Sequence, residues 1–414
     1  MNHFDFKRGV LWAEAVPLSR IADDVGTPTY VYSAATLRRH LGVVQSAFEK
    51  VPTVVCYSVK ANSNLAILGL FARGGSGFDI VSHGELARVL KAGGDPKKVV
   101  FSGVGKREDE MVAALEARIL MFNVESAEEL ALLDRVGRRL GVRAPFALRV
   151  NPDVDAKTHR YIATGLKTSK FGVPFEEAVA LYKASRRLKG LEARGVDCHI
   201  GSQLTDARPV KEAITRVAGL YAELKAQGFP LTHLDVGGGL GVTYSKERPP
   251  GVEEYAKAVL QSVPPHLGVT LVLEPGRVLV ANAGVLLTRV LFRKKTAAKR
   301  FLIVDAGMND LLRPALYEAH HDIVAVKPRR GSKTTMEIVG PVCESADVLG
   351  HGRSMSPLEQ GDLLAVKSAG AYGMSMASSY NSRCRPAEVL VDGKEYRVVR
   401  KREALEELWR GETA

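Results

Sequence analysis

A single lysine ends an apolar, strand-like run in the first part of the chain. Lys60 follows the run Val54-Val55-Cys56-Tyr57-Ser58-Val59, and a helix can begin behind it at Asn62 to Asn64. An apolar setting for the lysine stem at such a strand end disfavours the ammonium, so that the amine becomes neutral and nucleophilic. A neutral lysine amine can form a Schiff base with a carbonyl, including the aldehyde of pyridoxal phosphate (PLP). From this element alone, a solvated lysine that caps the strand is the alternative.

A run of glycines follows another apolar stretch later in the chain. Gly237, Gly238 and Gly239 come directly after Asp235-Val236. Successive glycines allow backbone N–H groups to approach an anion closely and to form a phosphate-binding nest. The spacing differs from the G-x-G-x-x-G pattern, so a Rossmann domain is not predicted. The run therefore indicates either a phosphate site or a flexible turn.

Two further strand-like runs end in polar groups that suit the same cofactor. Glu274-Pro275-Gly276-Arg277 supplies a carboxylate that can keep a pyridine nitrogen protonated, and an arginine that can pair with a carboxylate. His199 and Ser202 end the other run, where the imidazole could stack on a flat cofactor and the hydroxyl could donate to its phosphate. An internal Glu274–Arg277 ion pair and a structural histidine are the alternatives.

A thiol and a carboxylate adjoin in the second half of the chain. Cys343 and Glu344 lie in the turn Gly340-Pro341-Val342-Cys343-Glu344-Ser345. A thiol has a reference pKa of roughly 8.5 and can donate a proton near neutral pH. A small core residue is the alternative for an isolated cysteine. The histidines, including the His320-His321 pair, show no spacing typical of metal ligands, so no metal site is predicted.

The elements that must position these groups alternate between short apolar strands and helices. The expected strands are residues 53–59, 77–81, 98–102, 119–123, 144–150, 194–199, 231–236 and 270–274. Eight strand–helix units over about 240 residues match a (β/α)8 barrel, which carries its chemistry at the C-terminal ends of its strands. Lys60, Asp79, Arg149, His199, the glycine run and Glu274 fall at such ends. A doubly wound sheet is the alternative, because periodicity does not show closure.

After about residue 281 the alternation of strands and helices gives way to β-rich runs, which predicts a second domain. We expect a (β/α)8 barrel over residues 35–280 and an antiparallel β domain, a sandwich or barrel, over residues 281–414, joined by residues 1–34. The expected strands of the β domain include Val285–Leu291, Phe301–Val304, Met336–Val339, Asp362–Val366 and Glu388–Val391. A helix is expected from Ala34 to Lys50, with Ser33 as its N-cap.

Composition excludes several functional classes. The 414 residues are 46% hydrophobic and 25% charged, which is typical of a globular protein. No apolar run reaches the ~18 residues of a membrane span, and the N-terminus lacks a secretory signal. The four cysteines are too sparse for a disulfide framework, so we expect a cytoplasmic protein with reduced thiols. Despite the net charge of +12, the basic clusters are short and lack aromatic residues, so we expect no nucleic-acid partner.

Together these motifs resemble the alanine-racemase-like (fold type III) PLP-dependent decarboxylases, and within them the diaminopimelate decarboxylases. The resemblance extends over nearly the whole chain, from Gly26-Thr27-Pro28 to Arg402. The motifs that carry it are Tyr57–Asn62, Gly77–Ser82, His199–Gln203, Glu274–Arg277, Asp305–Tyr317 and Cys343–Ser345. Ser58 stands where the family commonly has alanine and His83 where it often has glycine, and neither is a contact residue in this interpretation.

The resemblance implies a PLP enzyme that works as a homodimer with shared active sites. Its catalytic residues would be Lys60 as the Schiff-base lysine, His199 against the cofactor ring, and Cys343 as a proton donor from the partner subunit. The implied cofactor-binding residues are Lys60, His199, Ser202, Gly237, Gly238, Gly239, Glu274, Gly276, Arg277 and Tyr372. The implied substrate-binding residues are Arg277, Arg313, Tyr317, Glu344 and Tyr372.

The implied reaction is decarboxylation of meso-2,6-diaminopimelate to L-lysine and CO2, the last step of lysine biosynthesis. The segments Asn151–His159 and Lys170-Phe171-Gly172 also resemble the diaminopimelate group, which favours this substrate over those of arginine, ornithine or carboxynorspermidine decarboxylases. Two alternatives come from other classes. An alanine-racemase-type isomerase would need a tyrosine base and an arginine in place of Glu274. A non-catalytic PLP-binding protein would lack Lys60 or the residues of the second domain.

Overall fold

The computed structural model describes residues 2–155 and 169–413, which fall into two compact units. The barrel unit comprises residues 40–242 and 247–278. The sheet unit comprises the residues up to 39, residues 243–246 and the residues from 279 onward. Among the described helices, none combines the length and the apolar character that crossing a membrane requires.

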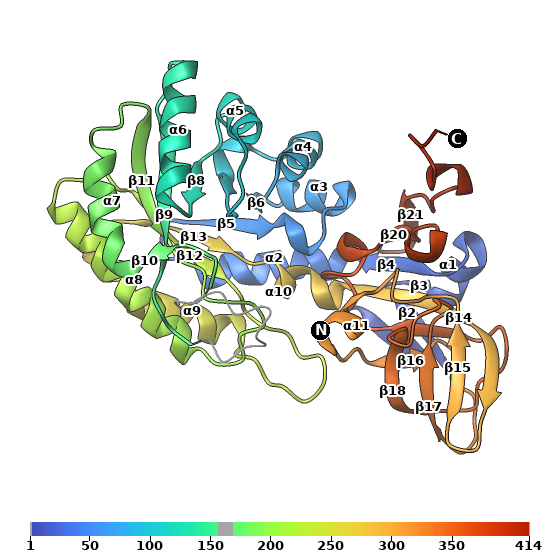
Figure 1. Cartoon of the computed structure of the whole chain (residues 1–414). Coiled ribbons are helices and arrows are strands. Elements are labelled where there is room, and N and C mark those ends of the chain that lie inside the picture. The colour runs from blue at the N-terminus through green and yellow to red at the C-terminus, as the bar shows by residue number, and fades with distance from the viewer. Residues whose placement is uncertain (1, 156–168, 414) are drawn as a thin grey trace. The chain divides into compact units, whose positions relative to one another are not determined.

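Eight parallel strands form a closed barrel in the first unit (Figure 1). They are β5 (Thr53–Ser58), β6 (Gly77–Ile80), β7 (Val99–Phe101), β8 (Met121–Val124), β9 (Ala144–Asn151), β11 (Leu191–Asp197), β12 (His233–Gly238) and β13 (Thr270–Glu274). Pairing of β8 with β9, with Phe122 opposite Phe146, closes the ring that β13 and β5 join on the other side. The predicted barrel is therefore confirmed, and the doubly wound alternative is wrong. A short strand, β10 (Val173–Pro174), pairs with β9 outside the ring.

Helices alternate with these strands and lie around the outside of the barrel (Figure 1). They are α3 (Leu65–Arg73), α4 (His83–Lys91), α5 (Glu108–Glu116), α6 (Ala127–Leu140), α7 (Ala178–Ser185), α8 (Arg208–Ala226) and α9 (Val252–Ser262). Local sequence sets where several begin, since the side chains of Asn64, Ser82 and Ser126 each accept a hydrogen bond from a backbone N–H of the first turn.

The helix α2 (Ala34–Ala47) begins where the sequence predicts and ends three residues earlier than Lys50. Ser33 is its N-cap, because the Ser33 Oγ accepts a hydrogen bond from the Thr36 N–H at 3.1 Å. After Ala47 the backbone tightens, because the N–H groups of Phe48 and Glu49 donate to the carbonyl groups three residues back, Gln45 and Ser46, instead of four. The prediction of the helix start is confirmed, and its end is corrected.

The barrel interior is layered. Cys56, Val100, Met121, Ala147 and Val272 pack together as an apolar layer. Nearer the C-terminal strand ends the buried side chains become polar. A filled apolar layer of this kind makes the barrel a packed core and confines the chemistry to one end of it.

The second unit is built mainly from strands. Its larger sheet contains β4 (Thr29–Ser33), β14 (Gly284–Lys295), β15 (Arg300–Val304), β16 (Ile323–Ala325), β17 (Thr334–Val339), β18 (Val348–Met355), β19 (Leu363–Val366), β20 (Ala387–Asp392) and β21 (Glu395–Arg400). A small sheet contains β1 (Phe4–Lys7), β2 (Val10–Ala13) and β3 (Val16–Pro17), and the helices are α1 (Leu18–Val25) and α11 (Arg313–Tyr317). Most neighbouring strands are antiparallel as predicted, but β15 with β17 and β4 with β20 are parallel pairs.

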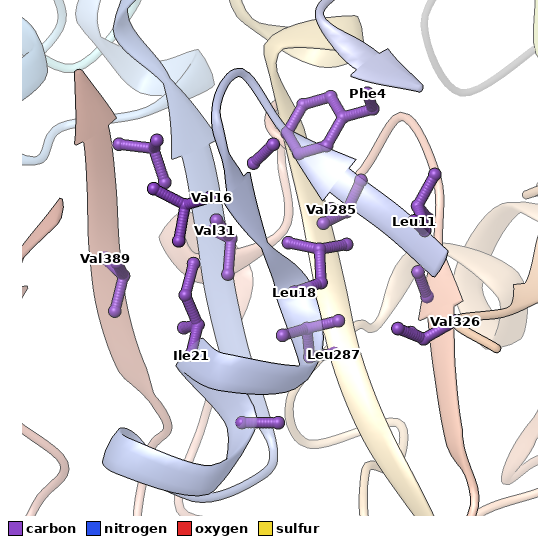
Figure 2. Packing of buried hydrophobic residues seen from close by; sticks show 14 residues of the cluster. Phe4, Leu11, Val16, Leu18, Ile21, Val31, Val285, Leu287, Val326 and Val389 are labelled. Carbon is purple, nitrogen blue, oxygen red and sulfur yellow. The ribbon is translucent and has the colours of Figure 1, made fainter. Parts of the chain in front are cut away.

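The N-terminal residues share a core with the C-terminal strands. Val31 of β4 packs beside Val285 and Leu287 of β14 and Val389 of β20 (Figure 2). Side chains from β1, β2, β3 and α1, including Ile21, complete the same cluster. Strand β4 pairs with β14 on one side and with β20 on the other, so this early strand is central to the sheet.

Candidate active site

Lys60 lies at the rim formed by the C-terminal ends of the barrel strands. It occupies a short helical turn, Val59–Ala61, directly after β5. Its Nζ is 2.5 Å from Oδ2 of Asp79, the next-to-last residue of β6. The lysine side chain is 36% exposed, whereas the Asp79 side chain is fully buried. The structure thus places an anionic partner beside the lysine, and this partner holds the amine at the rim.

The His199 imidazole is held in its neutral form. Burial lowers the pKa of His199 well below its usual range, and the nearby charges of Arg149 and Lys60 act in the same direction. Nδ1 accepts a hydrogen bond from the Gly238 N–H at 3.2 Å, which places the ring proton on Nε2. The separation of 3.6 Å between Nδ1 and Glu274 Oε2 is therefore a contact with a neutral ring and no ion pair. The His199 side chain is 15% exposed, so part of the imidazole ring can still contact a ligand.

Glu274 ends β13 as a buried carboxyl group. Its Oε1 accepts hydrogen bonds from Ser102 Oγ at 3.1 Å and Asn123 Nδ2 at 3.2 Å. Burial, with the nearby charge of Asp79, raises the pKa of Glu274 to about 7. A carboxyl group with this pKa changes its charge near neutral pH and responds strongly to a cation placed against it.

Two more carboxyl groups lie beside Glu274. Carboxylate oxygens of Asp197, Asp235 and Glu274 lie within 4.8 Å of one another, and all three residues are buried. Burial and the mutual proximity of these groups raise the pKa of Asp197 and Asp235 well above the usual range. A negative charge on any one of the three groups therefore disfavours a negative charge on the other two.

The glycine run is packed against the histidine. Gly237 has φ +65°, and a Cβ on it would lie 2.8 Å from His199 Nδ1, so a side chain at this position is excluded. The Gly237 N–H donates to Asp235 Oδ1 and the Gly238 N–H donates to His199 Nδ1. Two of the three amides are thus engaged within the protein.

A guanidinium and a hydroxyl adjoin the same rim. Arg277 Nη2 donates to Ser202 Oγ at 3.1 Å, and Arg277 is buried. Gly276 precedes the arginine, and a Cβ there would lie 3.1 Å from the Cβ of Ser58. The guanidinium of Arg277 thus holds the Ser202 hydroxyl at the rim.

The sheet unit carries the remaining predicted residues. Arg313 begins α11, with Nη1 2.8 Å from His321 Nε2 and the guanidinium 4.4 Å from the centre of the Tyr244 ring. Tyr317 ends the same helix and is partly exposed. Tyr372 is partly buried in a loop with φ +54°, a left-handed conformation that is uncommon for a residue with a side chain.

Cys343 and Glu344 lie in an exposed loop after β17. The thiol is free and exposed, and the Cys343 N–H donates to Asn381 Oδ1 at 2.9 Å. Glu344 Oε2 accepts a hydrogen bond from the Tyr380 hydroxyl at 2.7 Å. The buried Asp347 fastens the loop by accepting from the N–H of Val342 at 2.7 Å. The alternative that Cys343 is a small core residue is therefore wrong.

The sequence reasoning missed several polar residues of the barrel. Ser102, Asn123 and Asp197 are buried at or near strand ends and contact or adjoin Glu274. Each is a single polar residue in or beside a short apolar run, which carries little signal before the strands are known to form one ring. Residues 156–159 of the segment that favoured the diaminopimelate group lie outside the described residues.

The barrel residues fit a pyridoxal cofactor. Lys60 offers an amine at an open rim, and His199 offers a neutral and partly exposed imidazole. Glu274 offers a buried carboxyl group that can pair with a protonated ring nitrogen, and glycines lie beside an arginine and a serine. Asp79 Oδ1 is buried and has no hydrogen-bond partner in the part of the chain that the structure describes. It adds one acceptor beside the amine.

Comparison with known proteins agrees with this fit. Residues 34–281 match the family model described as pyridoxal-dependent decarboxylase, pyridoxal binding domain. The diaminopimelate decarboxylase of Vibrio cholerae is 55% identical, covering 99% of this chain and 98% of its own, and that of Pseudomonas aeruginosa is 54% identical, covering 100% and 99%. A crystal structure of diaminopimelate decarboxylase from Helicobacter pylori complexed with L-lysine superposes with a TM-score of 0.92 at 45% identity, covering 95% of this chain and 98% of that one.

Proposed function

The chain belongs to the pyridoxal-dependent decarboxylases, and within them to the diaminopimelate decarboxylases, and from this premise we propose how its residues convert meso-2,6-diaminopimelate into L-lysine and CO2. This reaction is the last step of lysine biosynthesis. One structural observation carries the proposal: the amine of Lys60 and the buried carboxyl group of Glu274 stand at the same rim of the barrel. The carboxylate in that place also argues against an alanine-racemase-type isomerase, for which an arginine was expected.

Bound PLP supplies an electron sink for the pair released when the Cα–carboxylate bond breaks. Lys60 would hold the aldehyde end of the cofactor, Glu274 would face its ring nitrogen, and His199 would contact its ring. The phosphate is assigned to Ser202, Gly239, Gly276 and Arg277. The neutral state of His199 suits this role, because a cation there would compete with the ring nitrogen for Glu274.

The substrate is held by its charges. Bond breakage at the D-centre leaves the L-amino acid end to be recognised, and the assigned partners are arginines for its carboxylate and Glu344 for its ammonium. Arg277, Arg313, Tyr317 and Tyr372 complete the assigned substrate contacts. The Cys343 thiol delivers the proton that replaces the lost carboxylate on Cα. A site with these charged partners rejects analogues that leave them unpaired.

We further propose that the enzyme is a cytoplasmic homodimer whose active sites are shared, so that Cys343 and Glu344 serve the site of the partner subunit. Both residues are exposed in the single chain, on a loop fastened from within by Asp347. Exposed catalytic groups on a rigid loop suit a site that is completed by a second copy.

The proposed function is tested by incubating the purified protein with PLP and meso-diaminopimelate and following CO2 and L-lysine together. L-ornithine, L-arginine and carboxynorspermidine are run beside it. We expect lysine from diaminopimelate and no CO2 from the other three. Release of CO2 only from another of these substrates would keep the cofactor and overturn the substrate, and no turnover of any of them would favour a non-catalytic PLP protein.

Replacing Glu344 by glutamine is expected to weaken substrate binding far more than it slows the chemical step. The change keeps the size of the side chain and an acceptor for Tyr380, and it removes the charge that pairs with the distal ammonium. Loss of one charge-assisted hydrogen bond predicts a rise in KM of roughly 10- to 100-fold. Steady-state kinetics check this, with Glu395→Gln at an exposed position of β21 as the control. An unchanged KM would remove Glu344 from the substrate site.

Binding of PLP is expected to weaken as the pH falls through about 7, the value to which burial and Asp79 raise the pKa of Glu274. Only the carboxylate form attracts a protonated ring nitrogen, so the attraction is present above this pH and lost below it. Titration of the cofactor-free protein with PLP, followed by fluorescence, measures the Kd across this range. The cofactor's own groups titrate in every variant, so Glu274→Gln serves as the reference. A wild-type profile that matches this variant would contradict the role of Glu274.

A further inference from the structure

Asn123 is a buried amide at the centre of the carboxyl cluster. It lies on β8 and has no exposed surface. Its Nδ2 is 3.1 Å from Ser102 Oγ, 3.1 Å from Asp235 Oδ2 and 3.2 Å from Glu274 Oε1. None of the motifs that resemble the decarboxylase family contains this residue.

The orientation of this amide is set by its neighbours. The Ser102 hydroxyl directs its proton to Glu274 Oε1, so Ser102 Oγ and Glu274 Oε1 both accept from the Asn123 amide. Turning the amide over would place its carbonyl oxygen against these acceptors. In the present orientation Asn123 Oδ1 has no hydrogen-bond partner in residues 2–155 and 169–413. A buried carbonyl group without a partner costs free energy, so the hydrogen bonds of the two N–H groups must offset that cost.

Asn123 joins two parts of the rim that are far apart in sequence. Asp235, which accepts from the amide, also accepts from the Gly237 N–H at 2.9 Å and so fastens the glycine run. Glu274, the other acceptor, ends β13. The amide thus connects the turn assigned to the phosphate side of the cofactor with the carboxyl group assigned to its ring nitrogen.

We propose that Asn123 is a positioning residue, which holds Glu274 and the Asp235–Gly237 turn in one hydrogen-bonded unit and so fixes the carboxyl group against the cofactor ring. The inference rests on the proposed function, because it assigns Asn123 a task in the same PLP site. Asn123 acts through Glu274 and Asp235. Its Nδ2 also donates to both carboxyl groups and so holds each of them toward the amide.

The test compares Asn123→Leu, which keeps the approximate volume and removes both donors, with the wild-type holoenzyme. We expect the Kd for PLP to rise roughly tenfold and kcat to fall by a similar factor, with KM for diaminopimelate within about threefold. The visible absorption of the bound cofactor should also change its pH dependence, because the carboxyl group at the ring nitrogen is less well held. Asn123→Ser, a smaller change, gives the same readouts if the leucine variant does not fold.

Two controls separate positioning from stability. Ser76→Ala removes a buried hydrogen bond to Val55 O at the opposite end of β6, and it should lower the melting temperature without changing the cofactor spectrum. In a Glu274→Gln background, the effect of Asn123→Leu on kcat should shrink to within about twofold, since two residues of one unit are not additive. Additive effects, or a loss of stability with unchanged spectrum and kcat, would overturn the proposal. Failure of the wild-type protein to bind PLP would instead overturn the proposed function.

Discussion

Lys60→Ala is expected to abolish release of CO2 and lysine while the barrel stays folded. The side chain lies at the open rim with 36% of its surface exposed, so its removal leaves no cavity in the core. The reaction, in contrast, loses the only amine that the proposal assigns to the cofactor aldehyde. Turnover should fall below detection, with circular dichroism close to that of the wild-type protein.

Lys60→Arg separates the nucleophile from the ion pair. Arginine keeps a positive charge for the buried carboxylate of Asp79, but its guanidinium stays protonated and does not react with an aldehyde. We therefore expect the arginine variant to be as inactive as the alanine variant and more stable. Lys91→Ala, at an exposed position of α4, should be fully active.

The covalent attachment itself can be read by mass spectrometry. Reduction of the holoenzyme with borohydride should leave the cofactor on the peptide that contains Lys60. Label on another lysine, or turnover by the arginine variant, would contradict the assignment.

Much of this site follows from the sequence because a barrel repeats one simple rule. Each strand is a short apolar run, and the residue that ends it points to one common rim once the ring closes. Lys60, His199 and Glu274 can therefore be placed at the rim from their positions after such runs. Closure itself depends on the pairing of β8 with β9, which local sequence does not encode.

Asn123 shows why other residues were missed. It stands inside Met121-Phe122-Asn123-Val124, a run in which a single polar side chain carries no signal of its own. Its importance arises from Asp235 and Glu274, which lie more than a hundred positions further along the chain. The ion pair between Lys60 and Asp79 likewise becomes visible only in the structure, because nothing in the sequence between the two residues indicates it.

The second sheet shows the same limit at the level of strands. The alternating runs predict β14, β15, β17, β19 and β20, and these strands are observed. Their order and direction depend on contacts between distant segments. Strand β4 lies parallel to β20 and antiparallel to β14, both more than 200 residues away in sequence. An antiparallel sheet is the natural expectation for short strands joined by tight turns, and the two parallel pairs depart from it.

Cys343→Ala is expected to lower kcat by about 10²- to 10⁴-fold, the usual contribution of a positioned proton donor, with little change in KM. The loop should keep its conformation, because the backbone N–H of Cys343 donates to Asn381 and that of Val342 donates to Asp347, and neither bond involves the thiol. Cys384→Ala, at a partly exposed free cysteine, is the control and should be fully active. Equal activity of Cys343→Ala and the wild-type protein would mean that another group delivers the proton.

The location of that proton donor can be tested by mixing two inactive variants. If Lys60 and Cys343 of one active site come from different subunits, a dimer of one Lys60→Ala chain and one Cys343→Ala chain contains one intact site. Random pairing in a symmetric dimer then restores about a quarter of the wild-type activity in the mixture, and about half in the purified mixed dimer. If both residues of a site come from the same chain, every site in the mixture lacks one of them and no activity returns. Co-expression of the two variants with different affinity tags, followed by purification of the mixed dimer, decides between these outcomes. An inactive mixed dimer would overturn the shared site and leave the assignment of each residue intact.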